Sequence, residues 1–252
     1  MKHMKYAVPL LLGGALVYQL ALAQAPRVPM QVPQGQAGAR FDLTGNWTAV
    51  VTEDWRWRML TAPKGDFASV PLNDEGKKVG NEWTEDQDGS CKAYGVGNLM
   101  RMPTRLQISW DSPQSLKIES DWGQQTRELY FRPGDAPATA ANSLQGVSIA
   151  RWELPVPVGG VQGYQPPDTG GDLKVITDHV APAWLRRNGA PYSGDAQITE
   201  YFQPFTDPLG RDWFDVTTEV DDPTYLIRPF VTSSDFRKEP DASKWSPHPC
   251  KT

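Results

Sequence analysis

Apolar and polar residues alternate with a period of two in eight short stretches of the chain, most of them separated by Gly, Pro, Asp or Ser turn signals. Such alternation predicts half-buried β-strands. Short strands at regular spacing indicate a sandwich or a barrel, and consecutive hairpins favour an up-and-down barrel, whose closure removes the exposed edges. The predicted strands cover residues 46–59, 105–110, 115–122, 126–131, 147–154, 172–180, 196–205 and 211–220.

We therefore expect an all-β fold, an up-and-down antiparallel barrel of about eight strands that forms a single domain over residues 41–252. The polar C-terminal tail offers one further strand. One or two short helices are expected after the first strand. One lies in residues 72–83, where Asn73 is a suitable N-cap followed by acids and then lysines. The other lies in residues 91–103 and stops at Pro103.

The N-terminus has a different pattern. Lys2 and Lys5 precede an apolar run over residues 6–23 that ends in Ala21-Leu22-Ala23, which fits a signal-peptidase site. We predict a signal peptide over residues 1–23, and thus a secreted or periplasmic protein without stable membrane insertion after cleavage; an uncleaved anchor is the alternative. Residues 24–40 are rich in Pro, Gln, Gly and Ala and are expected to be a flexible leader.

Charge and cysteine content narrow the class of protein. Cleavage removes two lysines and no acids, which moves the formal net charge from -5 to -7. An acidic chain without a basic stripe argues against a nucleic-acid partner and against binding to an anionic membrane surface. The two cysteines, Cys91 and Cys250, are expected to form a disulfide in an oxidising compartment; two free thiols are the alternative.

The first predicted strand contains a misplaced acid. Its apolar row is Trp47, Ala49, Val51, Trp55, Trp57 and Met59, and Glu53 belongs to the same row. A carboxylate in an apolar cavity has a raised pKa and can transfer protons near neutral pH. Three alternatives remain: the strand ends at Thr52, a bulge turns Glu53 outward, or Glu53 pairs with an inward arginine. The charged Asp54, Arg56 and Arg58 of the other row are expected to face outward.

The stretch "LTGNW" carries Gly45-x-Trp47 directly before this strand. It resembles the G-x-W signature that opens the lipocalin-family (calycin) barrel, in which the tryptophan plugs the closed end beneath the ligand cavity. The chain from "LTGNWTAVVTEDWRWRM" to "FRKEPDASKW" is also similar to secreted bacterial proteins of lipocalin-like type. The resemblance implies a ligand cavity. The lipocalin-like fold includes carriers of apolar molecules and enzymes acting on terpenoids, so it leaves the function open.

Two further residues are candidates for acid–base chemistry. His179 lies at a predicted strand end, where a barrel mouth would be, and histidine is a natural proton donor and acceptor near pH 7. Glu200 is flanked in its own row by Ile198 and Phe202, so it is predicted to project inward like Glu53. The alternatives are a hydrogen-bonded rim histidine and a carboxylate that clamps an arginine.

The aromatic residues suggest how a ligand would be held. Ten tryptophans are many for this length, and aromatic walls suit an apolar pocket, although they equally suit a filled core. Tyr192 lies on a loop that could cover the mouth. The candidate ligand-binding residues are Trp47, Trp55, Trp57, Arg186, Tyr192 and Tyr201.

Several chemistries lack support. The chain has no G-x-S-x-G elbow, Walker loop or G-x-G-x-x-G, and with His179 and His248 as the only histidines of the mature chain it cannot form a multi-histidine metal site. We expect no cofactor and no metal. The pattern favours a barrel protein that binds a small apolar or aromatic molecule. One alternative is a cofactor-independent lyase, isomerase or hydratase using the same cavity. The second is an envelope protein-interaction module that uses loops 132–145 and 155–172.

Overall fold

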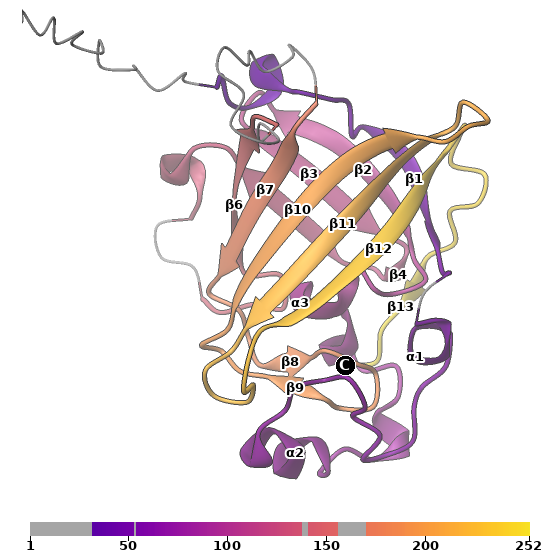
Figure 1. Ribbon diagram of the computed structural model, residues 1–252, viewed down its shortest axis with the longest axis vertical. Helices are drawn as coiled ribbons and strands as arrows, with labels where there is room; N and C mark the ends of the chain where they lie inside the picture. The colour runs from indigo at the N-terminus through magenta and orange to yellow at the C-terminus, as the bar shows by residue number, and fades with distance from the viewer. Residues whose placement is uncertain (1–31, 53, 138–140, 156–169) are drawn as a thin grey trace, which may run out of the picture. The chain divides into compact units, whose positions relative to one another are not determined.

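Nine strands close into a barrel in the described part of the chain (Figure 1). The computed structural model describes residues 32–52, 54–137, 141–155 and 170–252. The strand order is β1-β12-β11-β10-β7-β6-β5-β3-β2, and β1 closes the barrel by pairing with both β12 and β2. The barrel strands are β1 (Gly45–Val50), β2 (Arg105–Ser112), β3 (Ser115–Ser120), β5 (Thr126–Tyr130), β6 (Val147–Glu153), β7 (Asp172–Asp178), β10 (Gln197–Thr206), β11 (Asp212–Asp221) and β12 (Phe230–Glu239). The expected all-β barrel is confirmed.

The barrel departs from a strictly up-and-down meander at one seam. β5 and β6 run parallel and share only the pairs Leu129↔Ser148 and Tyr130↔Ile149. A parallel pair arises when the connection returns the chain to the end at which the previous strand began. The described residues 131–137 and 141–146 belong to that connection. The other barrel neighbours are antiparallel, and the ninth strand, β12, comes from the C-terminal tail.

The first strand is shorter than the alternation predicts. β1 ends at Val50, and residues 55–59 form the helix α1 (Trp55–Met59) instead of continuing the strand. The turn into this helix is made at Asp54, which has a left-handed φ of 52° and whose carbonyl accepts the amides of Trp57 and Arg58. The strand predicted over residues 51–59 is therefore wrong, because "WRWRM" satisfies a helical turn as well as a strand. Glu53 lies outside the described residues.

This helix also reverses one predicted orientation. Arg58 is only 2% exposed, and its Nε donates to the carbonyl of Arg101 at 2.9 Å. The expectation that Arg58 faces outward is therefore wrong, whereas Asp54 and Arg56 are exposed as expected.

The remaining helices follow the sequence signals. α2 (Asp74–Gly80) begins at the predicted cap, where the Asn73 side chain accepts the amide of Gly76 at 2.8 Å. A Cβ at Gly76 would lie 2.7 Å from the carbonyl oxygen of Tyr225, so this helix-weakening glycine allows close packing. Residues 91–99 form η3 (Cys91–Tyr94) and α3 (Val96–Leu99). Further 3-10 turns are η1 (Gln36–Gly38), η2 (Glu85–Gln87) and η4 (Pro133–Asp135).

Two small sheets complete the described fold. β8 (Ala183–Trp184) pairs with β9 (Pro191–Tyr192), and β4 (Trp122–Gly123) pairs in parallel with β13 (His248–Pro249). The β8–β9 sheet and α3 contribute to an apolar cluster that reaches Ile198, Val220 and Phe230. Because β10 begins, β11 ends and β12 begins near these residues, the cluster closes that end of the barrel. Among the described residues, no helix is long and apolar enough to cross a membrane.

The barrel interior is packed with inward-facing side chains. Rings meet across it: Phe214 lies 5.8 Å from Phe202 and 4.9 Å from Phe236, centroid to centroid, and Phe131 lies 5.5 Å from Trp152. The main core consists of Leu43, Trp47, Met100, Leu106, Ile108, Leu116, Ile118, Leu129, Phe131, Ala150, Trp152, Leu173, Val175, Phe202, Phe214, Val216 and Phe236.

Part of the expected leader belongs to this fold. Residues 1–31, and with them the predicted signal peptide, lie outside the described residues. Val32 packs against the main core, and the Gln34 side chain accepts the amide of Trp152 at 2.8 Å. The amide of Gln36 donates to the carbonyl of Pro113 at 2.9 Å. Residues 32–40, which we expected to be flexible, therefore include segments held against the barrel by side-chain and backbone contacts that composition does not reveal.

Candidate functional site

A cup of about 420 Å³ lies at the barrel end opposite the α3 cluster. Its walls come from the end of β10, the start of β11, the end of β12 and the start of β1, and residues 41–43 of the entering chain form one side. Inward-facing side chains near the strand ends, together with Phe205 and Trp213 of the outer rows at the rim, border this space, which we call the mouth cup. It is lined by Phe41, Asp42, Leu43, Trp47, Pro204, Phe205, Thr206, Asp212, Trp213, Phe214 and Lys238.

Trp47 forms the floor of the mouth cup. Strand alternation turns it inward from β1, where it is 3% exposed, and its Nε1 donates to the carbonyl of Leu43 at 2.8 Å. Its ring meets that of Phe214 edge to face, with centroids 4.8 Å apart. The hydrogen bond and the ring contact fix the orientation of the indole, so the floor is preformed.

Phe205 and Trp213 form an aromatic wall on the hairpin of β10 and β11. They are cross-strand partners whose rings stack at 5.8 Å and 17°. The Trp213 Nε1 donates to Asp207 Oδ2 at 3.0 Å, and the guanidinium of Arg211 lies 5.8 Å from its ring centroid. Phe205 remains 44% exposed. The Trp213 ring is held in place and the Phe205 ring beside it is exposed. This wall of the cup therefore needs little reordering when a ligand binds.

The same two rings also border a second cleft of about 430 Å³, on the outer face of the hairpin. It is lined by Val50, Thr52, Phe205, Asp207, Pro208, Leu209, Arg211, Trp213 and Asp235. The aromatic wall thus separates two hollows, one at the mouth and one outside.

Comparison of the chain with protein-family models, curated proteins and solved structures finds no match. Kinship with the lipocalin family therefore stays a prediction, and the function rests on the geometry of the chain itself.

Glu200 does project into the barrel, but an arginine occupies both of its carboxylate oxygens. Arg127 donates from Nη1 to Oε1 at 3.0 Å and from Nη2 to Oε2 at 2.6 Å, and both side chains are fully buried. The hydroxyls of Ser148 and Thr177 accept from the same guanidinium at 3.2 and 3.5 Å. This arrangement matches the arginine-clamp alternative.

His179 lies directly after β7, at the strand end where we expected it. Its φ is 53°, its side chain is 54% exposed, and its Nδ1 lies 2.7 Å from Asp178 Oδ1. The imidazole is thus on a surface turn, while the carboxylate of Glu200 is inaccessible to solvent. Neither residue lines the mouth cup.

The two tryptophans of α1 do not extend the row of Trp47. Trp55 is 59% exposed on the helix. The guanidinium of Arg186 lies 4.7 Å from the Trp57 ring centroid and is buried, with the residue 3% exposed. Burial, together with the nearby charge of Arg101, lowers the pKa of Arg186 to about 10. Trp55, Trp57 and Arg186 therefore lie outside the lining of the mouth cup.

The two tyrosines predicted to bind a ligand, Tyr192 and Tyr201, do not line the mouth cup. Tyr192 in β9 is fully buried against α3, and burial raises the pKa of its hydroxyl above the usual range. Tyr201 faces outward from β10, where Lys174 Nζ lies 5.0 Å from its ring centroid. Of the six predicted ligand-binding residues, Trp47 is the one that lines the mouth cup.

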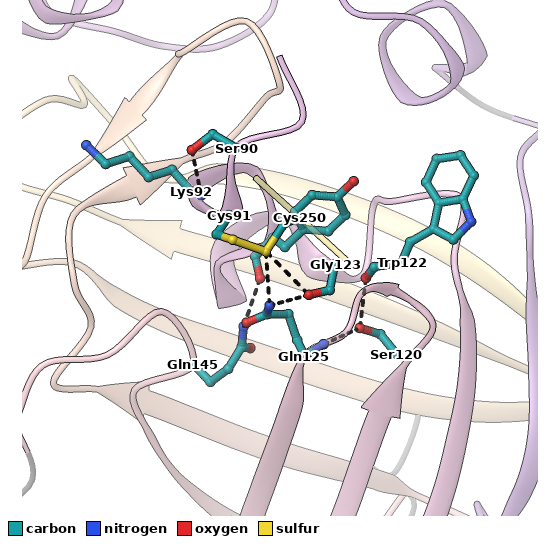
Figure 2. Close-up of a disulfide and its surroundings, with 10 residues drawn as sticks. Ser90, Cys91, Lys92, Ser120, Trp122, Gly123, Gln125, Gln145 and Cys250 are labelled. Carbon is teal, nitrogen blue, oxygen red and sulfur yellow. Dashed lines mark hydrogen bonds between the residues drawn. A yellow bond between two sulfur atoms is a disulfide. The ribbon is translucent and has the colours of Figure 1, made fainter. Parts of the chain in front are cut away.

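The predicted disulfide between Cys91 and Cys250 is confirmed. It joins the start of η3 to the C-terminal segment next to β13, and Figure 2 shows the amide side chains packed around it. Gln145 Nε2 donates to Gln125 Oε1 at 3.0 Å, and Gln125 Nε2 donates to the carbonyl of Gly123 at 2.6 Å. The disulfide thus joins the C-terminal segment to η3.

No cluster of His, Cys, Asp and Glu that could hold a metal ion occurs among the described residues. Sequence reasoning missed every cup residue except Trp47, among them Phe205, Trp213 and Lys238. Phe205 lies on the same outward row of β10 as Tyr201, and strand alternation alone does not show that this row reaches the rim.

Proposed function

We propose that this protein binds a small apolar or aromatic molecule in the mouth cup. The observation that carries the proposal is the cup itself, about 420 Å³ in volume with an ordered floor of Trp47 and Phe214. Small-molecule sites are concave, measure roughly 300–1,000 Å³ and combine apolar walls with a few polar groups. The lining of the mouth cup combines seven apolar side chains with the polar side chains of Asp42, Thr206, Asp212 and Lys238. A secreted or periplasmic carrier, as the N-terminal pattern predicts, is consistent with the disulfide.

The site we propose is at the mouth rather than deep inside the barrel. Side chains of the main core fill the interior, as the ring contacts of Phe214 with Phe202 and Phe236 illustrate. A ligand entering there would have to displace close-packed side chains, whereas at the mouth it covers the partly exposed Phe205.

The positions of the two acid–base candidates, Glu200 and His179, favour binding over catalysis. Glu200 is clamped by Arg127, and His179 lies on an exposed turn. Proton transfer requires a side chain within hydrogen-bond reach of the substrate. Neither side chain meets this condition for a ligand in the mouth cup.

The proposal is tested by titrating the purified protein with N-phenyl-1-naphthylamine, a neutral apolar dye that fluoresces when shielded from water. Phe205→Asp places a charge in the aromatic wall and is expected to weaken binding about tenfold or more, because the carboxylate must lose water. The matched control is Ile227→Asp, which changes another exposed apolar residue, 71% exposed, outside the cup lining. Equal affinity of both variants would reject the mouth cup as the site.

A further inference from the structure

The mouth cup has one cationic side chain among its described lining residues. Lys238 faces inward at the end of β12, opposite Trp47 in the register, and its Nζ lies 5.3 Å from the Trp47 ring centroid. In the described part of the chain it makes no ion pair and no hydrogen bond. Four other lysines are paired with acids, Lys77 with Asp74, Lys78 with Glu75, Lys117 with Glu119 and Lys244 with Glu239, whereas Lys174, like Lys238, lies over an aromatic ring.

The two acids of the cup already have hydrogen-bond donors. Asp42 Oδ1 accepts the backbone amide and the hydroxyl of Thr44 at 2.8 and 2.7 Å. Asp212 Oδ1 accepts the hydroxyl of Thr206 at 3.4 Å. These donors are neutral and hold each carboxylate by one oxygen, so the ammonium of Lys238 is the one cationic group in the described lining of the cup that can pair with an anionic ligand.

We infer that the ligand is an aromatic carboxylic acid, an inference that rests on the proposed function. Its ring would lie against Trp47 and Phe205, and its carboxylate would accept from the Lys238 ammonium. A hydrogen bond between ionised partners is roughly twice as strong as a neutral one. Because the ammonium lies beside the floor rather than out in solvent, it selects an acid group attached directly to the ring system or by a short linker.

Three naphthalene probes of one size separate charge from shape: 2-naphthoate, 2-naphthamide and 2-naphthylmethylammonium. Isothermal titration calorimetry of the full chain measures the affinity for each. We expect the acid to bind about fivefold more tightly than the amide, the magnitude of a partly exposed ion pair. The amine is expected to bind most weakly, because its charge has the same sign as Lys238.

Lys238→Met removes the charge but keeps an unbranched apolar side chain. It is expected to make the acid and the amide bind equally while leaving the affinity for the amide close to that of the original chain. Lys174→Met is the matched control, since Lys174 also lies over an aromatic ring, that of Tyr201, but on the outer face of the barrel. It should leave all three affinities unchanged.

The outcomes test the acidic character of the ligand separately from the proposed binding of a small molecule in the mouth cup. Equal affinity for acid and amide in the original chain, or an acid preference that survives in Lys238→Met, overturns the assignment of an acidic ligand while binding in the cup stands. Failure of all three probes to bind overturns the proposed function, and the inference with it.

Discussion

Arg127 and Glu200 form a doubly hydrogen-bonded ion pair inside the barrel, with contacts of 3.0 and 2.6 Å and no exposed surface on either side chain. The pair joins β5 to β10, which are separated in the barrel by β6 and β7. It therefore links two strands that share no backbone hydrogen bonds. The hydroxyls of Ser148 and Thr177 extend this polar layer within an otherwise apolar interior.

Removing one partner of this pair is expected to be costly. Glu200→Gln leaves the Arg127 guanidinium buried without a countercharge, and we expect the free energy of unfolding to fall by about 3–5 kcal/mol. The double variant Arg127→Met/Glu200→Leu removes both charges and should be closer to the original stability than the single variant. Urea unfolding followed by tryptophan fluorescence measures both. A single variant as stable as the original chain would show that the carboxylate is not charged in the interior.

The disulfide is expected to contribute to stability through the length of the chain that it closes. Cys91 and Cys250 are 159 residues apart, for which the chain-entropy model gives an upper value of about 5 kcal/mol. The variant Cys91→Ser/Cys250→Ser should lose between about 2 and 5 kcal/mol of unfolding free energy. Unfolding of the variant and of the oxidised original chain, compared without reductant, checks this value. Equal stability of the two would contradict it.

Asp207 organises the hairpin that carries the aromatic wall. Burial alone would raise the pKa of Asp207, but the amide and guanidinium of Arg211, the indole of Trp213 and the amide of Leu209 donate to its carboxylate and lower the pKa to about 2. Because the folded pKa lies below the usual 3.8, this carboxylate stabilises the fold fully above about pH 4, and the contribution is lost as pH falls toward 2.

The corresponding measurement is an NMR titration of the side-chain carboxyl carbon of Asp207. We expect a midpoint near pH 2, with the Trp213 indole signal shifting in the same range. Asp207→Asn serves to assign the resonance and removes the transition. A midpoint near 3.8 would show that the four donors do not act on the carboxylate in solution.

The strands were the most predictable part of the fold. Alternation located β2, β3, β5, β6, β7, β10 and β11 to within one or two residues at most ends, because one face of each strand is buried. Trp47 was correctly expected to face inward. The parallel seam between β5 and β6 was not predictable, because the periodicity of a strand carries no information about the direction of its neighbour.

The predictions failed where a tertiary contact outweighs the local pattern. "WRWRM" alternates like a strand, yet Arg58 turns inward to reach the Arg101 carbonyl and the segment becomes α1. Phe205 and Lys238 were not recognised as site residues because their roles depend on where β10 and β12 end relative to Trp47. Strand-end alignment is a property of the closed barrel and cannot be read from one strand.

The central claim is that the mouth cup is the ligand site, and the indole resonances of the ten tryptophans test it most directly. The chain is labelled with ¹⁵N at the indoles and titrated with N-phenyl-1-naphthylamine, with assignments from single Trp→Phe variants. We predict that the signals of Trp47 and Trp213 shift with saturation, while those of Trp83 and Trp122, which belong to a separate apolar cluster, stay in place. An unmoved Trp47 signal would contradict the account, even with a shift at Trp213, because Trp213 also borders the outer cleft.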